Sequence, residues 1–162
     1  MNMADTLQLT TPSDREIVMT RRLKAPRGLV WRTLVEPALV RQWLLGPPGW
    51  TMPECEIDLR VGGRYRFVWE NDGDGRRMAL GGVHTAIVEA QRIARTELFE
   101  PDWTSGETLV TLELFEFDGH TTVTTTVVYP TAKAREGALF SGMKEGVEMG
   151  YQRLDALLAV LS

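Results

Sequence analysis

The sequence is poor in the residues that form covalent cross-links and metal sites. It contains one cysteine, Cys55, and two histidines, His84 and His120, among 162 residues. A single cysteine excludes an internal disulfide and is typical of a reducing compartment, so we expect a cytoplasmic location. Zinc sites need several such ligands at characteristic spacings, which the chain does not offer. We therefore predict no metal site and no cofactor.

Clusters of positive charge and long apolar runs are also missing. The chain has 18 Lys and Arg residues against 22 Asp and Glu residues, for a net charge of −4 at pH 7. No basic cluster exceeds the pairs Arg21-Arg22 and Arg76-Arg77, which argues against a nucleic-acid-binding surface. No apolar run reaches the length of a membrane span. Residues 1–14 lack the features of a secretory signal, and we expect a flexible N-terminal segment there.

The rest of the chain has the patterns of a globular α+β domain. A strand is predicted over 16–23, followed by a helix over 27–35 and a second short helix that begins at Pro37 and carries Trp43. Six further stretches alternate like strands and are separated by turn residues. They cover Cys55–Leu59, Arg64–Glu70, Leu80–Glu89, Ile93–Phe99, Thr108–Phe117 and Thr121–Tyr129. Strands joined by tight turns predict an antiparallel meander with one apolar face to cover.

Residues 131–162 are predicted to form one long helix that covers this face. Gly142, Gly146 and Gly150 recur every four residues and lie on its buried half. Each interior glycine costs roughly 1 kcal/mol of helix stability relative to alanine, so the glycine stripe needs a reason. Either a backbone approaches closely or space is left for a ligand. Because leucines replace the glycines further along, we predict an ordinary core there and a cavity beside the first half.

Several short motifs, spread over most of the chain, form a joint pattern. They are Ala25-Pro26, Val30-Trp31, Trp43, Gly46-Pro47, Val61-Gly62-Gly63-Arg64-Tyr65-Arg66-Phe67, Arg92-Ile93, Thr96, Tyr129-Pro130, Ala134-Arg135-Glu136, Ser141-Gly142-Met143, Gly146 and Tyr151-Gln152-Arg153-Leu154-Asp155. Together they resemble the START-like (SRPBCC) superfamily, and within it the branch named after the C-terminal domain of the activator of the heat-shock protein 90 ATPase. The resemblance implies the helix-grip (START/Bet v-like) fold, in which a curved antiparallel sheet grips a long C-terminal helix over a cavity. We expect one START-like domain over residues 15–162, with six to seven strands and two short helices after the first strand.

The function that we expect is the binding of a small molecule rather than catalysis. The resemblance implies it, because many members of the superfamily bind hydrophobic small molecules, and an apolar cavity suits such a ligand. The predicted ligand-binding residues are Trp43, Trp50, Tyr65, Phe67, Trp69, His84, Trp103, Met143, Gly146, Val147 and Gly150. The three tryptophans Trp43, Trp50 and Trp103 are assigned to the mouth of the cavity. His84 is assigned to a polar contact that orients the ligand.

Two other functions stay open. Some relatives are cyclases or dehydratases, and an enzyme of this type would use His84 as a general acid or base in the same cavity. A chaperone-associated role is suggested by the family name alone, and a likeness of fold is a weak argument for function. A homodimer is also left open, because domains of this kind expose sheet edges and apolar loops.

Overall fold

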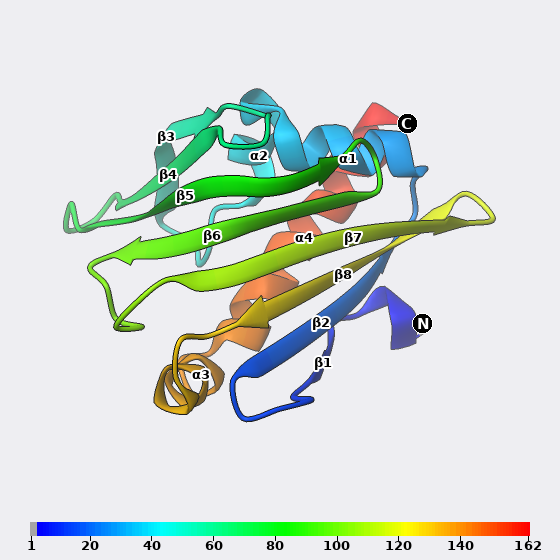
Figure 1. Cartoon of the computed structure of the whole chain (residues 1–162). Helices are drawn as coiled ribbons and strands as arrows, with labels where there is room; N and C mark the ends of the chain where they lie inside the picture. Colours follow the sequence, from blue (N-terminus) through cyan, green and yellow to red (C-terminus); the bar gives the residue numbers. More distant parts are fainter. Residues whose placement is uncertain (1–2) are drawn as a thin grey trace.

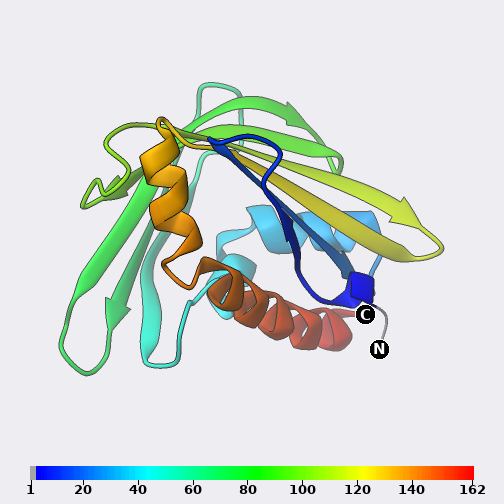
Figure 2. The same ribbon diagram turned by 90° about the horizontal axis from the view of Figure 1, so that it is seen from below.

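The computed structural model describes residues 3–162, which form one curved antiparallel sheet with helices on its concave side (Figure 1, Figure 2). The strands pair in the order β1-β2-β8-β7-β6-β5-β4-β3. The strands are β1 (Gln8–Thr10), β2 (Glu16–Leu23), β3 (Trp50–Ile57), β4 (Arg64–Asn71), β5 (Arg77–Val88), β6 (Arg92–Glu100), β7 (Thr108–Phe117) and β8 (His120–Val128). The helices are η1 (Met3–Asp5), α1 (Arg27–Val35), α2 (Pro37–Trp43), α3 (Ala132–Leu139) and α4 (Met143–Leu161).

The elements predicted at the start of the domain are confirmed. β2 and α1 have the predicted bounds, and α2 begins at Pro37. Proline suits this position because the first turn of a helix leaves its backbone N–H without a partner in any case. In β2 alternate side chains are buried, as the period of a half-buried strand requires.

The sheet has eight strands, whereas six to seven were predicted. The additional strand is β1, which pairs antiparallel with β2 so that Leu9 lies opposite Met19. A strand of three residues is too short for alternation to reveal it. It lies inside residues 1–14, whose expected flexibility stays a prediction. β3 also begins earlier than predicted, at Trp50, because its pairing with β4 resumes beyond an irregularity between Thr51 and Glu54.

The prediction of one long C-terminal helix is wrong, because the chain breaks between α3 and α4. Thr131 caps α3, since its hydroxyl oxygen accepts a hydrogen bond from the backbone N–H of Ala134 at 3.0 Å. Gly142 then adopts a φ of +82°, a left-handed conformation that favours glycine. The turn therefore accounts for Gly142, which belongs to no continuous glycine stripe.

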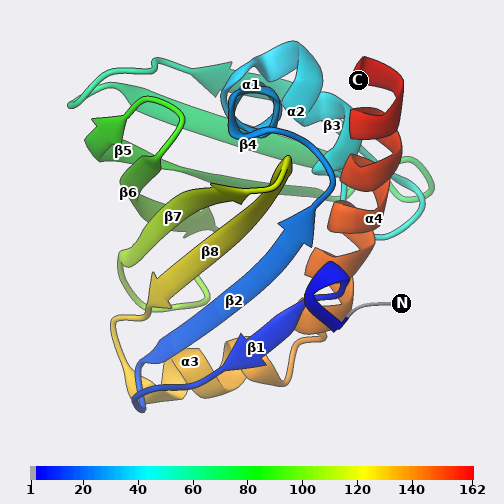
Figure 3. The same ribbon diagram turned by 90° about the vertical axis from the view of Figure 1, so that its right-hand side faces the viewer.

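Helix α4 crosses the concave side of the sheet (Figure 2) and lies against α2 and α1. Its second half completes the main core, where Leu154 and Leu158 are buried together with Leu23 and Val30. The predicted ordinary core in this half is thus confirmed. The first half of α4 lies near the edge of the sheet formed by β1 and β2 (Figure 3).

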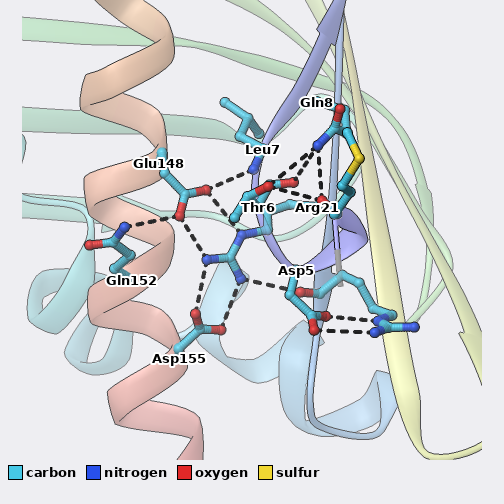
Figure 4. A network of polar contacts seen from close by, with 10 residues as sticks. Asp5, Thr6, Leu7, Gln8, Arg21, Glu148, Gln152 and Asp155 are labelled. Carbon is cyan, nitrogen blue, oxygen red and sulfur yellow. Dashed lines mark hydrogen bonds and ion pairs between the residues drawn. The ribbon is translucent and has the colours of Figure 1, made fainter. Parts of the chain in front are cut away.

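Arg21 of β2 ties α4 to this edge of the sheet (Figure 4). Its side chain is only 3% exposed, and Nη2 lies 2.9 Å from a carboxylate oxygen of Glu148 and 2.9 Å from one of Asp155. Glu148 also accepts a hydrogen bond from the backbone N–H of Leu7 at 2.8 Å. Burial raises the pKa of Glu148, but the hydrogen bonds from Arg21 and Leu7 outweigh burial and hold the pKa below its ordinary value. The network fixes α4 at the edge of the sheet.

Candidate ligand-binding cavity

A cavity of about 610 Å³ lies between the concave face of the sheet and α4. This volume is within the range of small-molecule sites, roughly 300–1,000 Å³. The lining is mostly apolar and rich in aromatic side chains. The aromatic residues are Trp43, Trp50, Phe67, Trp69, Phe99, Trp103, Tyr129 and Tyr151.

The two glycines within α4 shape the helix side of the cavity in different ways. A Cβ atom added at Gly146 would meet no atom within 4 Å, so the missing side chain leaves open space. A Cβ atom added at Gly150 would lie 3.7 Å from the carbonyl oxygen of Trp43 and 3.8 Å from a ring carbon, which is ordinary contact. Gly150 therefore brings Trp43 close to the helix. Gly146 is the position at which glycine keeps the cavity open.

Two tryptophans of the cavity wall, Trp43 and Trp69, have indole N–H groups that are already hydrogen-bonded. Nε1 of Trp43 donates to the carbonyl oxygen of Thr33 at 2.8 Å, and Nε1 of Trp69 donates to that of Leu44 at 2.8 Å. The ring of Trp43 also stacks on Tyr151 with centroids 5.9 Å apart. Because these N–H groups are bonded to backbone, the rings offer apolar surface to the cavity.

The tryptophans assigned to the mouth occupy two different depths. Trp103 is 43% exposed, and its ring centroid lies 5.1 Å from that of Phe99. Trp50 is half-buried, with the guanidinium carbon of Arg76 at 5.6 Å from its ring centroid. Trp43, in contrast, is 6% exposed and forms part of the inner wall rather than the mouth, because this last residue of α2 packs against Gly150 and Tyr151 of α4.

Tyr65 and His84 are the two predicted site residues that do not line the cavity. The hydroxyl of Tyr65 donates to the carbonyl oxygen of Thr96 at 2.6 Å, and its ring centroid lies 5.4 Å from that of His84. His84 is 1% exposed, with Nδ1 3.2 Å from the carbonyl oxygen of Gly63. Burial lowers the pKa of His84, which favours the neutral ring. The structure thus places His84 in a packed polar contact, away from a ligand in the cavity.

All other predicted site residues line the cavity together. They are Trp43, Trp50, Phe67, Trp69, Trp103, Met143, Gly146, Val147 and Gly150. They come from α2, β3, β4, the segment after β6, and α4. The lining of the cavity is thus assembled from segments that lie far apart in the sequence.

Two charged residues of the cavity, Arg95 and Glu97, were missed by the sequence reasoning. Both lie on β6, where side chains two residues apart point to the same face. Ile93 and Phe99 share that face and also line the cavity. Burial raises the pKa of Glu97, and the positive charge of Arg95 opposes this effect in part. The apolar cavity therefore contains a cation and a desolvated carboxyl group.

The remaining polar groups of the cavity are hydroxyls from residues such as Thr125, Tyr129 and Ser141. Among residues 3–162, no group of histidine, cysteine and acidic side chains is arranged to hold a metal ion. In the same range, no helix combines the length and apolar character needed to cross a membrane. The arrangement of the cavity is suited to enclosing an apolar body with a small number of polar contacts.

The family follows from a comparison with known proteins. The model of a family described as "Activator of Hsp90 ATPase homolog 1-like protein" matches residues 24–159. The chain belongs to this family. The resemblance predicted from the motifs is thereby confirmed. No curated protein matches the chain.

Solved structures of similar proteins share the fold. A crystal structure from Rhodobacter sphaeroides is 34% identical, with a TM-score of 0.91, and the match covers 96% of this chain and 99% of that one. Protein NE0264 from Nitrosomonas europaea is 26% identical, with a TM-score of 0.81 and coverage of 92% and 97%. The AHSA1-like protein from Aeromonas hydrophila, 17% identical with a TM-score of 0.70 and coverage of 88% and 93%, supports the fold alone.

Proposed function

We propose that this member of the Hsp90-activator-like family binds a mostly apolar small molecule in the cavity between the sheet and α4. The observation that carries the proposal is an apolar, aromatic-lined space of about 610 Å³ inside a small domain. Protein interiors are normally packed as densely as organic crystals, and unfilled space costs stability. A ligand that occupies the space offsets this cost.

The position of Gly146 supports the same proposal. A larger residue would be favoured in the helix by roughly 1 kcal/mol, and a Cβ atom has room at this position. Helix stability and local sterics would both favour a side chain here. Binding is the function that benefits from its absence, because the open space is continuous with the cavity.

The test is a titration with pyrenebutanol, an uncharged apolar probe that accepts excitation energy from tryptophan. We expect saturable binding to the wild-type protein. Gly146→Leu should weaken it by at least about tenfold, equal to about 1.4 kcal/mol, because the new side chain fills the cavity. Gly137→Leu is the matched control, since Gly137 is exposed on α3 and a Cβ atom there also meets nothing.

The control should bind the probe like the wild type. Equal binding by Gly146→Leu, or no saturable binding by the wild type, would contradict the proposal. Both variants should unfold cooperatively in urea, which verifies that the comparison is made between folded proteins.

The two alternatives predicted from the sequence have separate tests. A cyclase-type or dehydratase-type reaction that uses His84 predicts turnover that is lost in His84→Ala. A chaperone-associated role predicts a stable complex with the heat-shock protein 90 homologue of the same cell and a change in its ATPase rate. Neither outcome is expected from binding in the cavity alone.

A further inference from the structure

Arg95 is a cation in the cavity without an acceptor for its N–H groups. It lines the apolar space from β6, and its Nε is shielded from solvent without a hydrogen-bond partner. Within residues 3–162 its guanidinium takes part in no ion pair and no hydrogen bond, whereas Arg21 is held by two carboxylates. A buried N–H donor without an acceptor is unfavourable, so an anion in the cavity would find its partner already in place.

Two aromatic rings hold the guanidinium of Arg95 in position. Its central carbon lies 4.6 Å from the ring centroid of Tyr65 and 5.8 Å from that of Phe67. Tyr65 is itself fixed, because its hydroxyl donates to Thr96 and its ring packs on His84. These are cation–π contacts, in which the ring faces attract the positive charge. They occupy no hydrogen-bond acceptor, so the N–H donors of the guanidinium stay available for a ligand.

Glu97, the neighbouring charged residue, does not compensate Arg95. The two side chains lie on the same face of β6 but form no ion pair. Burial raises the pKa of Glu97, which favours its neutral form. The guanidinium of Arg95 therefore keeps its N–H donors free of this carboxyl group.

We propose that the ligand is an amphipathic carboxylate, whose carboxylate group is bound by Arg95 while its apolar body fills the aromatic part of the cavity. The planar, forked guanidinium matches a carboxylate with two parallel hydrogen bonds. Tyr65 and Phe67 act as positioning residues for this contact. This inference rests on the proposed function and specifies the chemical class of the ligand.

The test compares two probes that differ only in their head group, pyrenebutyrate and pyrenebutanol. At pH 7.5 we expect the wild type to bind the carboxylate about tenfold more tightly than the alcohol, as a charge-assisted hydrogen bond predicts. Arg95→Met should remove this preference, so that the variant binds the two probes with equal affinity. Arg95→Lys keeps the charge and should retain part of the preference. Arg92→Met, an exposed position on the same strand, is the matched control and should keep all of it.

The outcomes separate the two proposals. If the wild type binds both probes with equal affinity, the carboxylate inference is overturned while cavity binding stands. A preference that survives in Arg95→Met overturns it as well. If the wild type binds neither probe, cavity binding itself fails, and the inference with it. Should Arg95→Met not fold, the comparison of probes on the wild type and on Arg95→Lys decides the question.

Discussion

At the scale of single residues, Glu97 contributes a measurable link between the cavity and pH. Its pKa is raised by burial, and Arg95 on the same strand opposes the shift. The phenols of Tyr65 on β4 and Tyr129 after β8 face the same region, since the charge of Glu97 contributes to raising the pKa of each. A carboxyl group with a raised folded pKa binds its proton more tightly in the folded state. The stability that protonated Glu97 contributes is therefore complete below its unfolded pKa of about 4.5. This stability is lost as pH rises through the folded pKa.

We predict that Glu97→Gln gains stability relative to the wild type as pH rises from 4 to 8. Near pH 4 the two proteins should differ little, because Glu97 is protonated in both states. At higher pH the difference grows by about 1.4 kcal/mol for each unit of the pKa shift and then levels off. Urea unfolding at several pH values measures it.

Glu113→Gln is the control for this prediction, because Glu113 is exposed on β7. It should change stability little and equally at all pH values. If the difference in stability between Glu97→Gln and the wild type is constant with pH, a raised pKa for Glu97 is contradicted.

The charged pair of the cavity illustrates why residue roles were harder to predict than elements. The stretch 93–99 was correctly predicted as a strand, but its two faces are ambiguous. One face carries Ile93, Arg95 and Glu97, and the other alternates Ala94, Thr96 and Leu98, so polarity alone assigns the charged face to solvent. The pairing of β6 between β5 and β7 decides which face turns inward, and that pairing is a property of the sheet.

At the scale of elements, α4 is defined by a break at its start and a clamp along its side. The break is the left-handed turn at Gly142, and the clamp is Arg21 with its two carboxylates on α4. The four-residue spacing of glycines predicted one continuous helix because Gly142 falls in phase with Gly146. The spacing of glycines in a sequence cannot distinguish a glycine that leaves space beside a helix from one that adopts a positive φ.

We predict opposite effects for alanine at these two glycines. Gly142→Ala should destabilise the protein by about 1 kcal/mol, because alanine is strained at positive φ. Gly146→Ala should stabilise it by up to about 1 kcal/mol, since the position is helical and a Cβ atom meets nothing. Urea unfolding compares the two, and a change of the same sign at both positions would contradict the assigned roles.

The clamp predicts a large effect for a single buried ion-pair residue. Arg21→Met should destabilise the protein by about 3 kcal/mol, because it leaves Glu148 and Asp155 without their shared cation. Arg32→Met is the matched control, since the ion pair of Arg32 with Glu36 is exposed and contributes little to stability. Equal losses of stability in the two variants would show that the clamp is no stronger than a surface pair.

The pH dependence of the clamp has the opposite sign to that of Glu97. The folded pKa of Glu148 is depressed, so its contribution is present above its unfolded pKa and is lost as pH falls through the folded value. In Arg21→Met the loss of stability at acidic pH should be smaller than in the wild type. Urea unfolding between pH 3 and 6 measures it, and an unchanged slope of stability against pH would argue against the assigned coupling.

At the scale of the whole molecule, the order of elements was predictable because each carries its own local signal. The antiparallel sheet and the two early helices follow from alternation, turn residues and Pro37, and the family resemblance supplied the helix-grip arrangement. The missed strand β1 is stabilised by pairing with β2 instead of by a pattern of its own. The position of His84 outside the cavity depends on the packing of β4 against β5, which no local pattern encodes.

The five tryptophans allow a direct test of binding inside the molecule. Trp43, Trp50, Trp69 and Trp103 line the cavity, whereas Trp31 is buried in the core and does not. Each indole N–H gives its own signal in a proton–nitrogen NMR spectrum, so the spectrum reports which side chains the ligand reaches. With pyrenebutyrate added, we predict that the signals of the four lining tryptophans shift while that of Trp31 stays in place. A shift confined to the exposed Trp103, or no shift at all, would contradict a ligand-binding cavity.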